Sequence, residues 1–251
     1  MFHGKIRRLP KELLIKKEID LYNEEMELHM FLFDTHIHTS EVSPCSNVSA
    51  EDMVKVYLES RYDGVVITDH YSPDICDFES EPGLTTEGAV KRYLSGYETA
   101  LSAAAGRLTV LLGMELRFHG LNNDFLVFGM SEEFLLKYPD IRHMNPFSFH
   151  SLAQENNLLF YAAHPFRNGM KVISPSVLDG IEVMNGHPNH DSRNNLADIF
   201  ADQFQLLKSS GSDFHDTGCH ARGGILTKTR IRDNQDLIEC LKNQPSLIIT
   251  E

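Results

Sequence analysis

Short apolar runs alternate with amphipathic stretches from residue 31 onward, and this alternation constrains the fold more than any other feature of the sequence. The predicted strands are Phe31–Asp34, Gly64–Thr68, Leu108–Glu115, Asp124–Gly129, Leu158–Ala163, Gly180–Met184 and Ser246–Thr250. The predicted helices lie near residues 50–60 and 90–104, from Asp191 to about residue 209, and from Asn234 to about Lys242. Parallel neighbours in a sheet need helical crossovers, so this order predicts a largely parallel sheet.

Two architectures fit such a sheet, a closed β/α barrel and an open doubly wound sheet. Polar chemistry gathers at the C-terminal ends of all strands in a barrel, but at a single switch point in an open sheet. The sequence has no G-x-G-x-x-G motif and no P-loop, which removes support for nucleotide-binding open sheets. Polar side chains follow several of the predicted strands, so a β/α barrel is the predicted architecture.

The domain organisation follows from length and charge pattern. A chain of 251 residues is near the upper limit that one core serves, so a single main domain is predicted. Residues 1–30 carry a basic stretch followed by an acidic one, and we expect them to form an appended N-terminal arm. The barrel domain is predicted to span residues 31–251.

The charge balance limits the partners that this chain can bind. Lys and Arg number 23 against 36 Asp and Glu, a formal net charge of −13, so binding of long duplex nucleic acid is not expected. A small anionic substrate would need local help, such as metal ions. No apolar run reaches the roughly 18 residues of a membrane helix, so no membrane partner is expected. The four cysteines are scattered without a C-x-x-C pair, which predicts reduced thiols and a cytoplasmic location; the oligomeric state is open.

Side chains of metal-ligand type stand at the ends of the predicted strands. They lie in Asp34-Thr35-His36-Ile37-His38-Thr39, Thr68-Asp69-His70, Gly113-Met114-Glu115, Ala163-His164-Pro165 and Gly211-Ser212-Asp213-Phe214-His215. In a barrel these positions converge on one mouth, so residues far apart in the sequence would share one site. The sequence therefore predicts a metal site at the C-terminal ends of the strands.

The spacing within these motifs indicates more than one ion. Residues i and i+2 of an extended segment point to the same side, so His36 and His38 would present two imidazoles to one ion. Asp213 and His215 repeat this spacing. Together with Glu115, these donors exceed the four ligands of a closed zinc site. Glu115 is the natural bridge, because one carboxylate can place its two oxygens on two ions.

The remaining histidines lack this pattern. His119 and His187 lie close to motif residues. Each of them either lies on the rim of the site or contacts the substrate, and the sequence leaves both alternatives open. Ordinary exposed positions are expected for the others, which are His3, His29, His143, His150, His190 and His220.

The motifs D-T-H-I-H-T, I-T-D-H, G-M-E, A-A-H-P and G-S-D-F-H, in this order and spacing, resemble the signatures of the PHP family (polymerase and histidinol phosphatase). The resemblance extends from Phe31 to the C-terminus. It implies a distorted (β/α)7 barrel that holds two to three divalent ions, usually zinc, manganese or iron. It also implies hydrolysis of a phosphoester by metal-activated water, as a phosphatase or a phosphodiesterase.

Carried over by position, the resemblance assigns the metal ligands in two groups. One ion would be held by His36, His38, Glu115 and Asp213, and further ions by Glu115, His70, His164 and His215. The expected catalytic residues are Glu115, Asp213 and His215.

Two places depart from the family pattern. Many members carry another His or Asp five or six residues after H-x-H, where this chain has Ser43 and Pro44. Glu41 is the nearest carboxylate that would substitute, with Cys45 as a softer alternative. Many members also carry a histidine in the strand after G-x-E, and Asp124 stands near that place as the expected ligand.

Phosphate recognition needs fixed positive charge, preferably the two-pronged guanidinium of arginine. The candidates are Arg167, Arg222 and Arg117, each with a surface ion pair as the alternative. The expected substrate is a small phosphorylated compound, such as a nucleotide or a short oligonucleotide. Asp69 is expected to orient a neighbouring imidazole. Glu182 and Asn185 border the mouth in roles that stay open.

Two other functions are alternatives at this point. An amidohydrolase barrel also carries H-x-H after its first strand and cleaves C–N bonds with one or two metals. Such barrels usually need a bridging lysine after a middle strand, where this chain has Glu115 and His164 instead. The second alternative is a catalytically weakened barrel that only binds its ligand.

Overall fold

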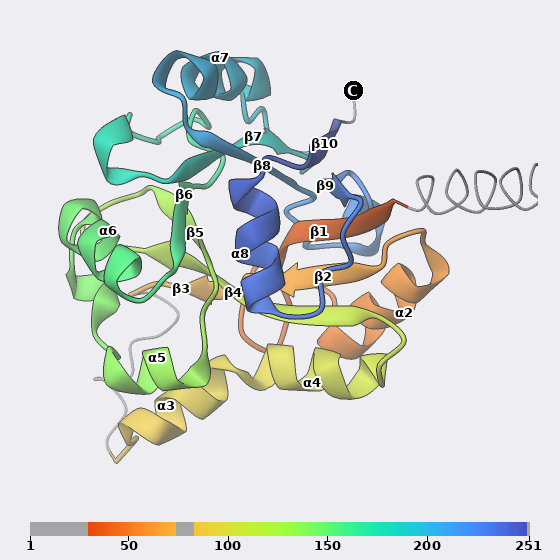
Figure 1. Cartoon of the computed structure of the whole chain (residues 1–251). Helices are drawn as coiled ribbons and strands as arrows, with labels where there is room; N and C mark the ends of the chain where they lie inside the picture. Colours follow the sequence, from red (N-terminus) through yellow and green to blue (C-terminus); the bar gives the residue numbers. More distant parts are fainter. Residues whose placement is uncertain (1–29, 74–82, 250–251) are drawn as a thin grey trace, which may run out of the picture. The chain divides into compact units, whose positions relative to one another are not determined.

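A computed structural model describes residues 30–73 and 83–249. Residues 1–29 of the predicted arm, with His3 and His29, lie outside the described residues, as does Cys76. The strands are β1 (Phe31–Ile37), β2 (Gly64–Ile67), β3 (His70–Tyr71), β4 (Thr109–Arg117), β5 (Asp124–Phe128), β6 (Leu159–Ala162), β7 (Gly180–Asn185), β8 (Leu207–Gly211), β9 (Gly223–Thr227) and β10 (Ser246–Ile249). The helices are α2 (Ala50–Glu59), α3 (Thr86–Tyr93), α4 (Ser95–Ala104), α5 (Glu132–Lys137), α6 (Pro146–Glu155), α7 (Asn194–Phe204) and α8 (Asn234–Lys242) (Figure 1).

The strands form one curved sheet in the order β10-β9-β1-β2-β4-β5-β6-β7-β8, with β3 beside β4. β1, β2 and β4 run parallel, and so do β6, β7 and β8. The expectation of a largely parallel sheet is wrong at two places, because β5 is antiparallel to β4 and β6, and β9 is antiparallel to β1 and β10. The loop from β4 to β5 covers residues 118–123 without a helix, and so short a connection joins antiparallel strands.

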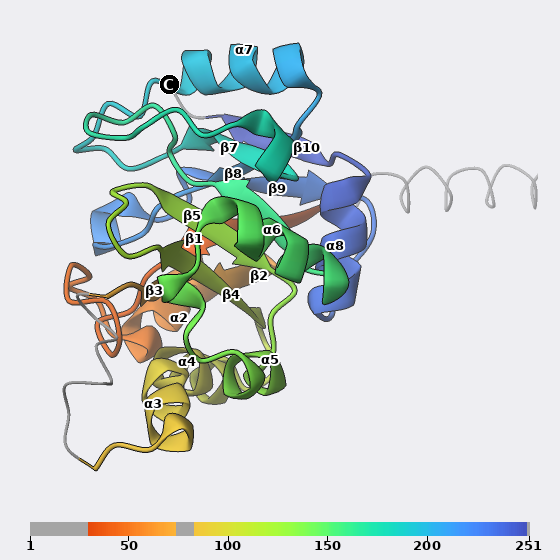
Figure 2. The same ribbon diagram turned by 90° about the vertical axis from the view of Figure 1, so that its left-hand side faces the viewer.

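The sheet curls until the segment after β8 reaches β1. Phe214 forms an isolated parallel bridge with Ile37, and its backbone exchanges hydrogen bonds with His36 and His38 at 3.2 and 3.1 Å. Gly211 permits this approach, since a Cβ on it would lie 2.3 Å from the Cβ of His36. Helices such as α4 and α7 lie outside the sheet (Figure 2), whereas α8 covers one end of the barrel. The predicted distorted β/α barrel is therefore confirmed as a nearly closed, mixed sheet.

One end of the barrel is filled with apolar side chains. Leu237 and Leu241 of α8 pack in one buried cluster with Phe33, Leu111 and Leu159. These strand residues come before the ligand-bearing ends of β1 and β4 and before the loop that carries His164. The apolar core thus occupies one end of the barrel, and the polar ligand-type residues lie at the opposite end. None of the described helices is long and apolar enough to span a membrane.

The structure matches some predicted helices and corrects others. α8 has the predicted bounds, and α2 begins with the expected cap, in which the Ser49 hydroxyl accepts from the Asp52 N–H at 3.1 Å. The helix expected over residues 90–104 is two helices, because α3 ends at Tyr93 and α4 begins at Ser95. The helix expected from Asp191 begins at Asn194 and ends at Phe204. Residues that were expected to continue it form β8 instead.

Candidate metal centre

Three strands bring four buried side chains together at the polar end of the barrel. His36 is the last residue but one of β1, His38 directly follows that strand, Glu115 lies on β4, and Asp213 follows β8. The Nε2 atoms of His36 and His38 lie 3.0 Å apart, and each is 3.4 Å from Oδ1 of Asp213. All four residues are buried, so their donor atoms face one another away from bulk water.

The two oxygens of Glu115 face different imidazoles. Oε1 lies 2.9 Å from Nε2 of His164 and 3.4 Å from Nε2 of His36. Oε2 lies 2.9 Å from Nδ1 of His70 and 3.3 Å from Nε2 of His38. Within the described part of the chain Oε2 is buried without a hydrogen bond. This is the arrangement that a carboxylate bridging two cations requires.

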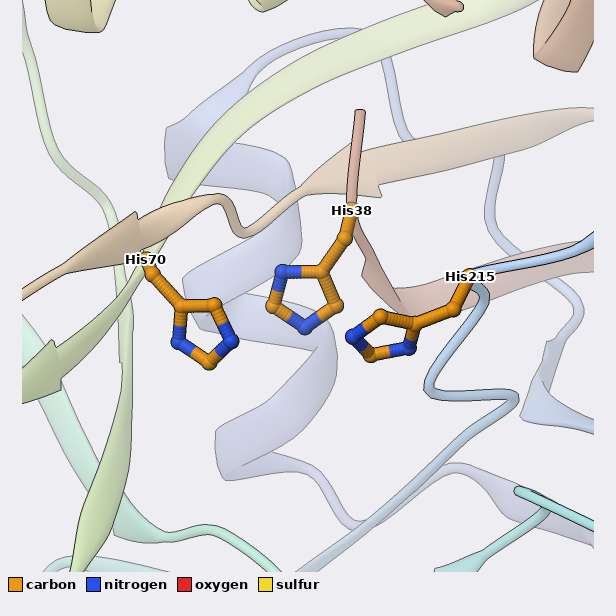
Figure 3. A group of neighbouring side chains, drawn as sticks. All are labelled: His38, His70 and His215. Atoms are coloured by element: carbon orange, nitrogen blue, oxygen red, sulfur yellow. The ribbon is translucent and has the colours of Figure 1, made fainter. Parts of the chain in front are cut away.

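A third group joins His38, His70 and His215 from three separate segments. Figure 3 shows the three rings with ring nitrogens turned toward a common space, and these nitrogens lie within 4.8 Å of one another. Cys45 adjoins this group, with its Sγ 3.2 Å from Nε2 of His215. Burial raises the pKa of the Cys45 thiol, but hydrogen bonds with His215 and His70 outweigh burial and lower the pKa to about 6.

The two replacement ligands proposed from sequence differ in their placement. Asp124 joins His70 and Glu115, with donor atoms within 4.8 Å of one another. Both of its carboxylate oxygens also accept hydrogen bonds from Arg117, at 2.7 and 2.8 Å. Glu41 is exposed, and its two oxygens accept from the Ala50 N–H at 3.0 and 2.9 Å, at the start of α2. The structure therefore brings Asp124 to the cluster and does not bring Glu41 there, because Glu41 caps a helix.

The three candidate arginines differ in whether they line the cavity at the cluster. Arg167 donates from Nη2 to Oδ2 of Asp213 at 2.8 Å and to Oδ1 of Asn185 at 2.9 Å. Arg167 and Arg117 line a cavity of about 280 Å³ at the cluster. Arg222 does not belong to the described lining of this cavity, and its Nε donates to the carbonyl of Gly186 at 2.8 Å.

The polar residues around the ligands hold the imidazoles in place. Glu182 lies with Oε1 2.8 Å from Nδ1 of His36, and its Oε2 accepts from the backbone N–H of His164 at 2.9 Å. Asp69 accepts from the Ser43 hydroxyl at 2.7 Å, and that hydroxyl lies 3.3 Å from Nδ1 of His38. Asp69 thus reaches an imidazole through Ser43. The sequence left the role of Glu182 open, although a glutamate inside an apolar strand was a signal for it.

The histidines outside the motifs fall in two places. His187 and His190 line the cavity, and their ring centroids are 4.6 Å apart. His190 had been expected to be an ordinary surface residue, and it is exposed but stands at the cavity mouth. His119 stacks on His143 with ring centroids 5.9 Å apart, outside the described lining of the cavity.

The imidazoles and carboxylates of the cluster shift one another's pKa values. Burial alone would lower the pKa of His36, but the carboxylates of Glu182, Asp213 and Glu115 outweigh it and raise the pKa well above the usual value. Burial would raise the pKa of Glu115, but His70 and His36 hold it well below its ordinary range. The low pKa of Glu115 and the raised pKa of His36 both reflect attraction between carboxylate charge and positive charge on the imidazoles, as in a site built around cations.

The donor set fits divalent metal ions. Imidazole nitrogens and carboxylate oxygens suit zinc, iron and manganese, and buried carboxylates are costly without a paired cation or a metal. Two of the ligand-type residues, His164 and Asp213, hold positive φ angles of 26° and 52°. Such backbone conformations cost energy in residues other than glycine and cluster at functional sites.

Comparisons with solved structures show similarity in fold. The fold is similar to that of PsfC from Pseudomonas syringae, at 19% identity and a TM-score of 0.64, over 89% of this chain and 93% of that one. It also resembles a two-domain protein from Bacteroides vulgatus that contains a predicted PHP-like metal-dependent phosphoesterase, at 15% identity and a TM-score of 0.61. The match covers 88% of this chain and 65% of that protein, so this chain spans less than two-thirds of its length.

A third similar structure is a lesion-specific endonuclease from Pyrococcus furiosus, at 13% identity and a TM-score of 0.56, with 88% of this chain and 58% of that one covered. At these identities the similarity shows the fold. No curated protein matches the sequence. The family model of the PHP domain matches residues 34–243, which is most of the chain, and the chain therefore belongs to the PHP domain family.

Proposed function

We propose that the chain is a metal-dependent phosphoesterase that hydrolyses a small phosphorylated substrate with water as the nucleophile. The observation that carries the proposal is the position of Glu115, whose two oxygens face two different sets of imidazoles at 2.9–3.4 Å. One carboxylate in this position would hold two cations close together, which is the requirement of phosphoester hydrolysis at paired ions. Membership of the PHP family supports the same chemistry.

The chain's own residues would hold the ions in the following way. His36, His38 and Asp213 would form one site with Glu115. A further ion beside Glu115 would bind His164, which groups with Glu115 and His36, and Asp124 groups with Glu115 and His70. Zinc, manganese and iron suit these donors, and two or three ions are expected. When bound, such ions lower the pKa of water and neutralise charge on the phosphoryl oxygens.

The phosphoryl group would bind at Arg167. Its guanidinium is tied to Asp213 and Asn185, lies at the cavity, and would contact a non-bridging oxygen of the substrate. Arg117 faces the same cavity but is held by Asp124, so it would contribute through that carboxylate. His187 and His190 at the mouth would contact the leaving group.

The substrate class follows from the cavity and the charge. A space of about 280 Å³ holds a phosphoryl group and part of a small leaving group, such as that of a nucleotide or a short oligonucleotide. The net charge of −13 disfavours long duplex substrates. A cytoplasmic location is part of the proposal and rests on the scattered cysteines.

The proposal is tested with the full chain, stripped of metal and reloaded separately with manganese, zinc or iron. Each form is assayed on phosphomonoesters, phosphodiesters and amides. We expect turnover of a phosphoester that disappears with chelator and returns with metal. Metal-dependent turnover of amides alone would contradict the proposal and favour the amidohydrolase alternative. Metal binding without turnover of any substrate would favour the binding barrel.

A further inference from the structure

We propose that Cys45 is a thiolate ligand of a third ion, which it shares with His70 and His215. The proposal deepens the proposed function, since it assumes that the cluster holds metal. It assigns a sulfur donor to a position for which the sequence had left Glu41 and Cys45 as alternatives.

The first step is a count of donors. His38 lies between two groups, but its Nε2 is 3.0–3.4 Å from His36, Glu115 and Asp213, and its Nδ1 faces Ser43 at 3.3 Å. One ring nitrogen binds one ion, so His38 is committed to the first site. His70 and His215 are then left with two nitrogens, one fewer than the three protein ligands usual for a zinc ion that keeps an open position.

The second step is the position of the sulfur. Sγ of Cys45 lies 3.2 Å from Nε2 of His215, and Cys45 lines the same cavity as His70 and His215. Nδ1 of His70 faces Glu115 at 2.9 Å, and Figure 3 shows its other ring nitrogen turned toward His215. Cys45 is therefore the side chain that completes a set of one sulfur and two nitrogens.

The third step is the loop that carries Cys45, because it is fastened to both histidine segments. On one side, the Asn47 N–H donates to the carbonyl of His215 at 2.9 Å. On the other side, the Ser43 hydroxyl accepts from the His70 N–H at 3.1 Å. Pro44 restricts the backbone between Ser43 and Cys45. The sulfur is thus placed by the loop backbone.

The ligand type has a chemical consequence. A thiolate is a soft donor that favours zinc and cobalt over manganese, whereas the nitrogen and oxygen donors around Glu115 accept all of these ions. On binding, the thiol releases its proton to solvent as the sulfur–metal bond forms. The third site should therefore select a thiophilic ion, while the other sites accept a wider range.

The test uses cobalt as a spectroscopic probe in the full chain, with Cys45→Ser and Cys45→His as variants and Cys240→Ser as the matched control. Cys240 is a free thiol outside the cavity lining. Cobalt bound by thiolate gives an intense charge-transfer band in the near ultraviolet. We expect the band in the parent chain and in Cys240→Ser, and its absence in both Cys45 variants.

Metal content and alkylation give two independent readings. Cys45→Ser should bind one of its zinc ions at least roughly tenfold more weakly, since even the loss of an outer partner of a ligand costs that much. Cys45→His should restore zinc content without the band. Bound zinc should protect Cys45, but not Cys240, from iodoacetamide, as mass spectrometry of the modified peptides would show.

A charge-transfer band that survives in Cys45→Ser, or zinc content and alkylation that do not respond to Cys45, would overturn the proposal. These readings do not depend on turnover. A chain with the band but without phosphoesterase activity would contradict the proposed function and leave the thiolate site standing. Phosphoesterase activity in a chain whose band, zinc content and alkylation do not respond to Cys45 would contradict the thiolate site and leave the proposed function standing.

Discussion

Arg167 donates from Nη2 to Oδ2 of Asp213 across 2.8 Å, so the guanidinium at the cavity is held by a proposed metal ligand. Nη2 also contacts Oδ1 of Asn185 at 2.9 Å and the Ser192 hydroxyl at 3.2 Å. An exterior ion pair, the alternative raised from sequence, would not lie among these buried partners. We therefore propose two tasks for Arg167, to orient Asp213 and to offer positive charge to the substrate.

Arg167→Ala should lower kcat/KM for the best phosphoester by roughly ten- to a thousand-fold, the scale of losing one donor to developing charge. Arg167→Lys should recover only part of the loss, because an ammonium cannot reproduce the two-pronged contact. Steady-state kinetics measure both, with exposed Arg107→Ala as the control. Unchanged kinetics in Arg167→Ala would remove it from phosphate binding.

Glu115→Gln keeps the size of the side chain and removes the charge that would hold two cations together. Turnover should fall at least roughly a hundredfold, and at least one bound ion should be lost, while the melting temperature of the metal-free chain changes little. Turnover, metal content and thermal melting are measured on the same samples.

Glu41→Gln serves as the comparison for this variant, because Glu41 caps α2 away from the cluster. It should keep both its metal and its turnover. Loss of an ion in Glu41→Gln would return Glu41 to the ligand set, and normal metal content in Glu115→Gln would refute the bridging role.

Glu182→Gln should weaken metal binding without abolishing the fold. The Glu182 carboxylate lies 2.8 Å from Nδ1 of His36 and fixes which nitrogen of that ring faces the cluster. Loss of such an outer partner usually costs 10–100-fold in metal affinity. Competition with a chromophoric chelator measures the affinity, with exposed Glu133→Gln as the control. Equal affinities for the two variants would show that Glu182 is only structural.

Asp34 should make the stability of the metal-free chain depend on pH. Burial raises its pKa to about 6, against which the hydrogen bonds with Ser212 and Tyr57 act only partly. A raised carboxyl pKa favours folding while the group is protonated, so the contribution is complete below the unfolded pKa of 3.8 and is lost as pH rises through about 6.

Asp34→Asn keeps the acceptor for the backbone and loses this titration. Relative to the parent chain, its free energy of unfolding should increase, and the variant become more stable, by up to about 3 kcal/mol between pH 4 and pH 7. Urea unfolding across that range measures the difference. A difference that is constant with pH would show that Asp34 titrates normally.

The ligand cluster was open to prediction because its members stand at the ends of apolar strands. His36, Glu115 and His164 each follow or end a run that the sequence marks as buried, and the barrel topology brings such ends together. The sequence alone could not decide between Cys45 and Glu41 as the replacement ligand. Their difference depends on the path of one loop, which hydrogen bonds with His70 and His215 determine.

The missed strands have a different cause. β8 reads Leu-Lys-Ser-Ser-Gly, without an apolar run, and its buried Ser210 is hydrogen bonded inside the barrel wall. The Ser210 hydroxyl donates to the Ile248 carbonyl at 2.6 Å, and the Ser210 carbonyl accepts from the Thr35 hydroxyl at 2.8 Å. Strands held by such contacts give no hydrophobic pattern, and the antiparallel placement of β5 likewise has no signal in local periodicity.

The central claim is that the cluster around Glu115 binds at least two divalent ions. Anomalous X-ray scattering from crystals of the full chain, loaded in turn with manganese, zinc and iron, tests it most directly. The account predicts at least two peaks, one among His36, His38 and Asp213 and another beside Glu115 toward His164. Diffraction from well-ordered crystals with no anomalous peak at either position, for any of the three metals, would contradict it.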